Sequence, residues 1–255
     1  MGNYVTLNTA SVTISGYEKV VEKMTDRETE EKLEKAKLFN EHLYQGTNTE
    51  DEDKCLNMDD GVICYVDIPK ISVYLSVYYG TDDEVLYKCC GYIENTSLPV
   101  GAINTHAAMS GHTGLPGAEL LSSLDKLGKE DVLYIHTLGQ TLAYRVDQIK
   151  KVEPENSRDL EIVPGKDLVT LVTCTPYGIN SHRLLVRGTR IPYTPEIQEA
   201  SAGTPIAEKG LSNAMIRQLI IIGGIVLTTV VVVLAAAIYI HHLKKQRNAG
   251  KDDES

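Results

Sequence analysis

The chain of 255 residues lacks the features that mark several common protein classes. It has 25 Lys and Arg against 35 Asp and Glu, a net charge of −10, so it offers no basic stripe to the phosphates of a nucleic acid. Its five cysteines have no regular spacing, which argues against a disulfide scaffold and CxxC zinc knuckles. There is no GxSxG elbow and no HExxH motif, so neither a serine hydrolase nor a catalytic zinc is supported. We expect no metal, no cofactor and no nucleic-acid partner.

What the sequence does carry is a strand-like run that ends at a cysteine. Residues 168–173 are apolar or β-branched, Cys174 follows, and a Thr-Pro-Tyr-Gly turn leads to Arg183, which opens the run 183–188. This pattern predicts a hairpin with Cys174 and Arg183 side by side at one end of a sheet. A nearby fixed cation favours the thiolate, the nucleophilic form. The alternative is a buried cysteine that packs as a small hydrophobe, beside a solvated arginine.

A histidine supplies the partner that a cysteine nucleophile needs. His112 lies in Ser-Gly-His-Thr-Gly-Leu-Pro, after the apolar run 107–109 and before a Gly/Pro-rich turn. It is therefore expected on a loop at a strand end, where functional histidines are often found. We predict Cys174 as nucleophile, His112 as general acid/base and Arg183 as the group that stabilises the oxyanion or the substrate.

The stretch from 61 to 193 has the pattern of many short strands. Runs 62–68 and 71–78 are separated by Pro-Lys, and 132–138 with 141–149 predict a hairpin. Short helices are expected at 82–89 and 118–127, and His136 and the Cys89–Cys90 pair are interpreted as packing residues. Seven or eight strands with few helices favour a closed antiparallel or mixed β-barrel.

These motifs resemble the sortase family, specifically class C, the pilin-polymerising cysteine transpeptidases of Gram-positive bacteria. TLVTC with Arg183 nine residues on, and GHTGLP 62 residues before the cysteine, carry the resemblance together with stretches 104–127 and 174–193. It runs from about Gly61 to Tyr193. It implies a mainly β fold with a closed eight-stranded sortase-type β-barrel, and it implies that His106 is not the catalytic histidine.

The resemblance also implies a substrate. Cys174 would cleave an LPxTG-like sorting signal between Thr and Gly, form a thioacyl intermediate and pass it to a pilin Lys amine, which builds pilus isopeptide bonds. A housekeeping-type sortase that anchors surface proteins to the cell-wall precursor stays open as an alternative, as does a membrane-anchored thiol protease. A non-enzymatic surface adhesin is the alternative of another class, although it would need none of the three residues.

The N-terminal part predicts a helix laid against the domain. Residues 17–44 have a helical pattern with a capping box at Thr25 and Glu28, and an apolar stripe follows at Leu33, Ala36, Phe39 and Leu43. Residues 1–16 are polar, with no apolar core of signal-peptide length. Because class C sortases usually carry an N-terminal export segment, we expect either that the chain starts late or that export depends on the C-terminal segment.

Residues 45–60 occupy the place of the class C lid. That lid carries an Asp-Pro-aromatic motif whose Asp meets the catalytic arginine, and this sequence has no Asp-Pro. Two interpretations stay open: an open cleft, or an unorthodox plug formed by Cys55, Leu56 and Met58.

The C-terminal part predicts a membrane anchor. Leu219 to Ile240 is an uncharged run, long enough at about 1.5 Å per residue to cross a bilayer, and Lys244, Lys245 and Arg247 follow it. The positive-inside rule then places the tail in the cytoplasm and the barrel outside the cell membrane. The expected parts are a polar segment 1–16, a helical and lid-region segment 17–60, a catalytic barrel 61–193, an extracellular linker 194–217, a transmembrane helix 218–240 and a tail 241–255.

Overall fold

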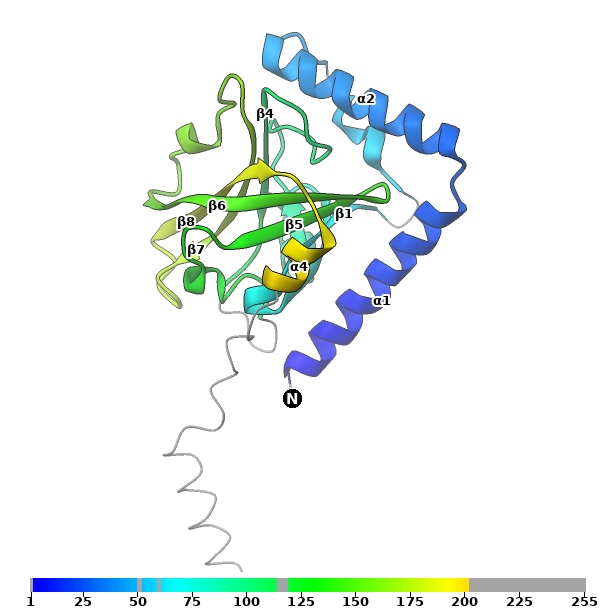
Figure 1. Ribbon diagram of the computed structural model, residues 1–255. Helices are drawn as coiled ribbons and strands as arrows, with labels where there is room; N and C mark the ends of the chain where they lie inside the picture. The colour runs from blue at the N-terminus through cyan, green and yellow to red at the C-terminus, as the bar shows by residue number, and fades with distance from the viewer. Residues whose placement is uncertain (1, 50–51, 59–60, 114–118, 202–255) are drawn as a thin grey trace, which may run out of the picture. The chain divides into compact units, whose positions relative to one another are not determined.

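The computed structural model describes residues 2–49, 52–58, 61–113 and 119–201, and its centre is a closed barrel of eight strands (Figure 1). The strands follow one another around the barrel as β1-β2-β3-β4-β7-β8-β6-β5. Their bounds are β1 Val62–Ile68, β2 Val73–Tyr79, β3 Cys90–Tyr92, β4 Thr105–Ser110, β5 Val132–Thr137, β6 Gln140–Val152, β7 Asp167–Thr175 and β8 His182–Ile191. The predicted closed, mainly β barrel is confirmed.

The barrel is mixed, and one of its parallel pairs matters for the site. The pairs β2–β3 and β4–β7 are parallel, whereas the other six pairs are antiparallel. The predicted hairpins β5–β6 and β7–β8 are both present. Because β7 pairs with β4 on one side and β8 on the other, two strands far apart in the sequence flank it.

The side chains of β4, β7 and β8 point alternately toward the hydrophobic core and away from it. Successive side chains of a strand point to opposite faces. The hydrophobic core cluster takes one residue in two from three neighbouring strands: Ala107 and Met109 of β4, Val169 and Leu171 of β7, Leu184 and Val186 of β8. Thr170, Val172 and Cys174 therefore belong to the opposite face of β7, as Arg183 does on β8.

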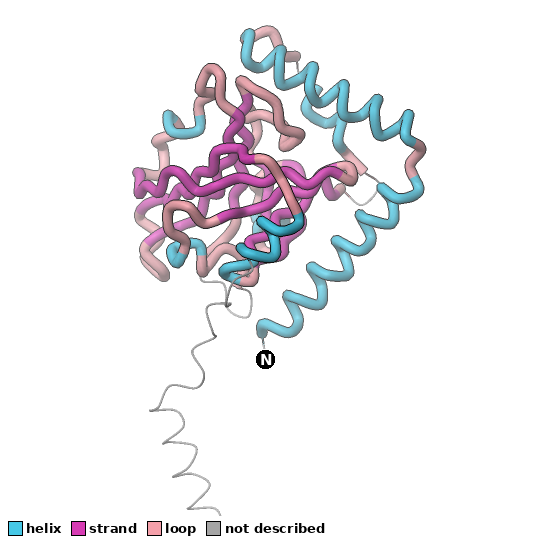
Figure 2. Tube along the Cα trace, viewed as in Figure 1, coloured by secondary structure: helices cyan, strands magenta, loops and turns pink. Residues whose placement is uncertain are grey.

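Two long helices precede the barrel, α1 at Gly2–Lys23 and α2 at Asp26–Gln45, drawn in cyan beside the magenta strands in Figure 2. The single helix predicted over 17–44 is thus divided at Thr25, whose extended backbone (φ −71°, ψ 153°) cannot continue a helix. The capping box is confirmed: the Thr25 hydroxyl accepts from the Glu28 amide, and the Glu28 carboxylate accepts from the Thr25 amide at 2.8 Å.

Helix α1 begins at Gly2, inside the stretch expected to be only a polar segment. Tertiary contacts explain this helix better than intrinsic propensity does, since Thr, Ser and Asn are modest helix formers. Ile14 and Tyr17 are buried, and the Tyr17 hydroxyl accepts from the Leu138 amide at 2.8 Å and donates to the Ile63 carbonyl at 3.3 Å. The helix is fixed to β1 and to the β5–β6 turn by one tyrosine.

Helix α2 docks through the predicted stripe. Leu33, Ala36 and Phe39 are buried, and Leu43 packs partly buried against the core. The buried Asn40 adds a polar contact, because its amide group donates to the Leu98 carbonyl at 3.1 Å and accepts from the Leu98 amide at 2.7 Å. This pair fixes α2 to the connection between β3 and β4.

The remaining helices are short: η1 Glu52–Leu56, η2 Pro69–Ile71, α3 Asp83–Leu86, η3 Leu124–Lys126, η4 Arg158–Leu160 and α4 Pro195–Ser201. The helix predicted over 118–127 is wrong in its described part, where turns lead to η3. Leu120 has a φ of 34°, which no α-helix accommodates. Helix α4 lies in the stretch predicted as a linker.

The predicted transmembrane helix 218–240, its tail and most of the linker lie outside the described residues. Within the described ranges, no helix is both long and apolar enough to cross a membrane.

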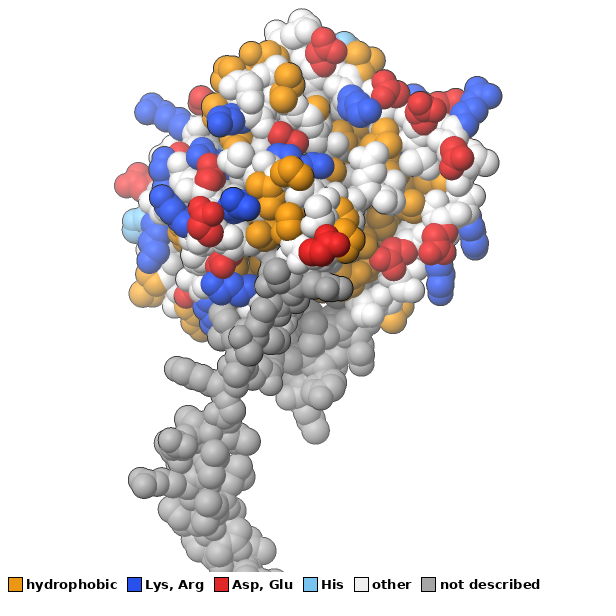
Figure 3. Space-filling model, viewed as in Figure 1, with side chains coloured by type: hydrophobic (Ala, Val, Ile, Leu, Met, Phe, Trp, Pro, Cys, Tyr) orange, Lys and Arg blue, Asp and Glu red, His pale blue; other side chains and the backbone are white. Residues whose placement is uncertain are grey.

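On the face shown in Figure 3, acidic and basic side chains are interspersed.

Candidate active site

The hairpin β7–β8 brings the predicted nucleophile and cation together. Cys174 and Arg183 are direct cross-strand partners next to the loop that closes this hairpin. Residues opposite one another in an antiparallel pair have their Cβ atoms about 4.5–5.5 Å apart and share a face of the sheet. Both side chains are partly exposed. The structure confirms that they lie side by side, on the face of the sheet opposite the core.

The parallel pair β4–β7 brings the histidine to the same end. Ser110 is in register with Val172, so His112 and Cys174 each lie two residues further along neighbouring strands. The pairing continues past the end of β4, since the Gly111 amide donates to the Val172 carbonyl at 3.0 Å. His112, Cys174 and Arg183 therefore stand in one row from the end of β4 across β7 to β8. The predicted position of His112 on a loop at a strand end is confirmed.

The hydroxyl of Thr173 holds the histidine loop to the nucleophile's strand. Thr173 Oγ1 donates to the Gly111 carbonyl at 2.7 Å and lies 2.5 Å from Thr113 Oγ1. Because the single hydrogen of Thr173 is used on Gly111, Thr113 is the donor of the second bond. The residues on both sides of His112 are thus bound by the residue that precedes Cys174, which couples the positions of His112 and Cys174. Sequence analysis missed Thr173, since a threonine in a strand carries no distinguishing pattern.

Arg183 is held by its own loop. Its Nη1 donates to the carbonyls of Asn180 and His182, both at 3.3 Å, and in the part of the chain that is described no carboxylate forms an ion pair with it. The carbonyl contacts leave the guanidinium charge unneutralised at the site. Beside it, the β7–β8 loop presents Tyr177 and Ile179 with about 70% and 71% of their surface exposed.

His106 has a different environment, which fits a structural role. Its Nδ1 lies 2.8 Å from the Glu161 carbonyl, which can only accept, so Nδ1 carries the hydrogen and Nε2 accepts from the Thr170 hydroxyl at 2.7 Å. Burial lowers the pKa of His106, which keeps the ring neutral. The neutral ring ties β4 and β7 to the β6–β7 connection, as expected for a histidine that is not the catalytic one.

His136 is likewise a structural residue, as the sequence indicated. It lies on β5 with its ring stacked on Tyr65 at 4.4 Å. Burial lowers the pKa of His136 to about 4, so the ring stays uncharged at neutral pH.

The segment 52–58, in the place of the class C lid, is fixed on another part of the barrel. Leu56 and Met58 belong to the core cluster, and the Leu56 amide donates to the Tyr79 hydroxyl of β2 at 3.2 Å. Lys32 of α2 donates to the carbonyls of Cys55 and Asn57 at 3.2 and 3.0 Å. In the barrel order β3 and β4 separate β2 from β7, so two strands lie between these anchors and the strand of Cys174.

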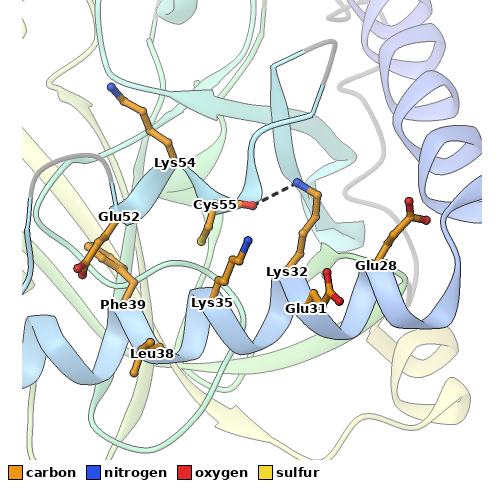
Figure 4. A pocket seen from close by; sticks show the side chains of 9 residues that line it. All are labelled: Glu28, Glu31, Lys32, Lys35, Leu38, Phe39, Glu52, Lys54 and Cys55. Carbon is orange, nitrogen blue, oxygen red and sulfur yellow. Dashed lines mark hydrogen bonds between the residues drawn. The ribbon is translucent and has the colours of Figure 1, made fainter.

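A cavity of about 550 Å³ lies between α2 and η1, and Cys55 is one of its lining residues (Figure 4). Three lysines and three glutamates share its lining with Leu38 and Phe39, and no histidine does. Burial raises the pKa of Cys55 to about 11, which keeps it a thiol at neutral pH. Among its lining residues the cavity has a cysteine and cations, but it has neither a histidine partner nor a thiolate at neutral pH.

Comparison with known proteins agrees with this geometry. The family model described as Sortase domain matches residues 66–191. A structure of Streptococcus pneumoniae sortase C is 44% identical, with 71% of this chain and 97% of that chain covered and a TM-score of 0.67. A structure of Clostridium perfringens sortase C with the C-terminal cell wall sorting motif is also 44% identical, with 72% and 100% covered and a TM-score of 0.68.

A more distant likeness is to sortase A of Streptococcus agalactiae serotype III (strain NEM316). It is 31% identical over 117 residues, which are 45% of this chain and 47% of that protein. The chain thus matches about half the length of this relative, whereas it covers nearly the whole of the two sortase C structures.

Proposed function

Because the chain belongs to the sortase family, as a class C member by its structural relatives, we propose that it is a cysteine transpeptidase that joins pilin subunits. It would cleave an LPxTG-like sorting signal between Thr and Gly and transfer the acyl group to a lysine amine. The observation that carries the proposal is the row of His112, Cys174 and Arg183, fixed by strand register and by the Thr173 hydroxyl.

The first half-reaction forms the thioacyl enzyme. The Cys174 thiolate attacks the carbonyl carbon of the signal's Thr, and the negative charge that develops on the carbonyl oxygen is stabilised by Arg183. The C–N bond to Gly then breaks, and His112 in its protonated form gives its proton to the departing amine. Arg183 suits this task because its charge is not paired with a carboxylate of the described residues.

The second half-reaction regenerates the enzyme. A lysine amine attacks the thioester carbonyl, neutral His112 accepts the proton that the amine loses, and the C–S bond breaks to release the Cys174 thiolate. The product is an isopeptide bond between two chains. Water in place of the amine would give only hydrolysis, so the ratio of the two products distinguishes a transpeptidase from a thiol protease.

The pilin-joining type is favoured over a housekeeping sortase by the structural relatives. Both sortase C structures are covered almost completely at 44% identity, and one carries a cell wall sorting motif while the other is described in terms of pilin substrate specificity. A housekeeping enzyme would use the amine of the cell-wall precursor as acceptor.

The location at the cell membrane is part of the proposal. The uncharged run 219–240 and the basic residues that follow it support a single C-terminal transmembrane helix, with the barrel outside the cell. Protease treatment of intact cells tests it: the barrel should be digested and a short C-terminal tag should be protected. Digestion of the tag instead would contradict this orientation.

Intact mass spectrometry tests the chemistry. The full chain in detergent is mixed with an LPxTG-type peptide, with and without a lysine-bearing pilin peptide. We expect a thioacyl adduct that disappears in Cys174→Ala, and a peptide–lysine conjugate when both peptides are present. If no adduct forms on a Cys174 that does react with a small thiol reagent, the substrate class is wrong. Absence of reaction with that reagent would show an occluded cleft.

A further inference from the structure

An exposed tyrosine lies against the catalytic histidine, on the side away from the arginine. The ring of Tyr87 is 5.5 Å from the ring of His112, at an interplanar angle of 59°. Tyr87 keeps 58% of its surface exposed, so much of its ring is accessible to a ligand. It directly follows the short helix α3, Asp83–Leu86.

Register and close packing explain why Tyr87 reaches this position. Strand β3 is antiparallel to β4 with Gly91 opposite Ser110, so the chain that enters β3 runs past the start of the His112 loop. A Cβ on Gly111 would lie only 3.1 Å from Cys90 Sγ, and a Cβ on Gly91 only 2.1 Å from the Gly80 carbonyl oxygen. The first contact packs Cys90, at the start of β3, against the histidine loop, and the second packs β3 against the end of β2. The α3 turn, which precedes β3, thereby lies beside His112.

The order of the strands places Tyr87 on the side of His112 from which the amine-bearing substrate would approach. Across the sheet the order is Arg183 on β8, Cys174 on β7, His112 after β4, and Tyr87 before β3. Arg183 and Cys174 hold the acyl part of the substrate, and His112 must reach the amine nitrogen in both half-reactions. The amine-bearing chain has to lie next to His112, and the surface beyond His112 is formed by Tyr87.

The charges of α3 suit an amine. Tyr87 donates its amide to the Asp83 carbonyl, a helical i,i+4 relation that puts the Asp83 carboxylate on the same face as the Tyr87 ring. Glu84 is instead paired with Lys88 at 3.2 Å, and within the described residues no cation is paired with Asp83. A lysine ammonium is recognised by an aromatic face together with a nearby carboxylate.

We propose that Tyr87 and Asp83 form the binding subsite for the acceptor lysine. The inference rests on the proposed function, and it names the residues that receive the second substrate. The Tyr87 ring contacts the alkyl stem and the ammonium of the incoming lysine, and Asp83 attracts its charge, so that the nitrogen is delivered to His112 for deprotonation. The ligand class is a primary amine on a flexible cationic side chain, presented by a partner protein.

The test separates the two half-reactions of the full chain in detergent. Thioacyl formation is followed with a sorting peptide alone, and the KM for a lysine-bearing peptide is measured from conjugate formation. We expect Tyr87→Ala to raise the acceptor KM about tenfold and Asp83→Asn about threefold, with a much smaller change in the rate of thioacyl formation. Tyr87→Phe should keep most of the affinity, because the ring remains.

Two controls match these variants. Glu84→Gln changes a carboxylate of the same turn that is already paired, and Tyr44→Ala removes an exposed tyrosine from α2. Neither should alter the acceptor KM. Hydroxylamine, a small uncharged acceptor, should be used equally well by wild type and Asp83→Asn.

The outcomes are distinguishable. An unchanged acceptor KM in Tyr87→Ala overturns the inference. An equal loss in both half-reactions also overturns it, since Tyr87 would then only orient His112. If the wild-type chain forms no thioacyl adduct with any sorting peptide, the proposed function itself fails.

Discussion

Strand β7 and the short helix η1 each place a cysteine near basic side chains. At the end of β7, Cys174 faces Arg183 across a strand pair, and a histidine loop is bound to the residue before it. At η1, Cys55 lies in a cavity among three lysines, one of which, Lys32, donates to the Cys55 carbonyl rather than to its sulfur. Burial there keeps the thiol protonated.

The two cysteines differ in which groups their neighbouring cations contact. A lysine that satisfies backbone carbonyls fixes the chain, while burial keeps the sulfur a protonated thiol. An arginine held by its own loop on the exposed face keeps its charge available to the sulfur and to a substrate oxygen. The four predictions below test this contrast, beginning with the largest effect.

Substitution of each cysteine by alanine should affect the rate of conjugate formation very differently in the two regions. We expect Cys174→Ala to lower the rate of conjugate formation by at least about 10⁴-fold, because the covalent intermediate is lost. Cys55→Ala should stay within about twofold of wild type, as measured by the same assay. Loss of activity in Cys55→Ala, with the fold intact by circular dichroism, would show that the cavity takes part in the reaction.

Removal of each cation should have different consequences. Arg183→Ala should lower kcat/KM by about 10²- to 10³-fold, the usual effect of losing an oxyanion partner. Arg183→Lys should recover only part of this, since a lysine lacks the planar fork.

Lys32→Met is the matched change at η1. We expect it to lower the free energy of unfolding by about 1–3 kcal/mol, because two carbonyls lose a charged donor, and to leave kcat/KM unchanged. Equal catalytic losses in both variants would contradict the contrast.

The reactivity of Cys55 should show its raised pKa. A thiol with a pKa of about 11 stays protonated at neutral pH, so alkylation of Cys55 at pH 7 should be about 300-fold slower than that of an ordinary thiol. Its rate should rise about tenfold per pH unit up to pH 10, because only the thiolate reacts. Iodoacetamide labelling of Cys174→Ala with peptide mapping measures this, and a plateau near pH 8–9 would show an ordinary thiol.

The smallest effect concerns the bond between the histidine loop and β7. Thr173→Val keeps the shape but removes the hydroxyl, and we expect kcat/KM to fall about tenfold as His112 loses its fixed position. Thr173→Ser should restore activity. Thr170→Val on the same strand is the control: it breaks the bond to His106, so it should lower stability without a comparable fall in kcat/KM.

Much of the catalytic row could be predicted because its signals are local. The hairpin of Cys174 and Arg183 follows from two apolar runs and a turn, and the position of His112 at a strand end follows from its flanking sequence. The capping box at Thr25 is likewise a short-range pattern.

The features that could not be predicted depend on contacts between distant segments. Helix α1 is fixed to the barrel by Tyr17, a buried residue whose hydroxyl contacts Ile63 and Leu138, both far from it in the sequence. The parallel pairing of β4 with β7 joins segments about 60 residues apart, and no local pattern specifies it. The same holds for Tyr87 beside His112, since α3 reaches the histidine loop only through the packing of β3.

The insertion of β7 between β4 and β8 also determines when the chain acquires its activity. Cys174 lies on β7 and His112 just after β4, and these two strands, about 60 residues apart in the sequence, must pair before the two side chains meet. Such a non-local pairing has a high entropic cost and forms together with the rest of the barrel. Catalysis is thereby linked to completion of folding. A nascent or partly unfolded chain carries Cys174 but lacks the arrangement of side chains that transpeptidation requires. Loss of activity in denaturant should therefore coincide with unfolding of the barrel.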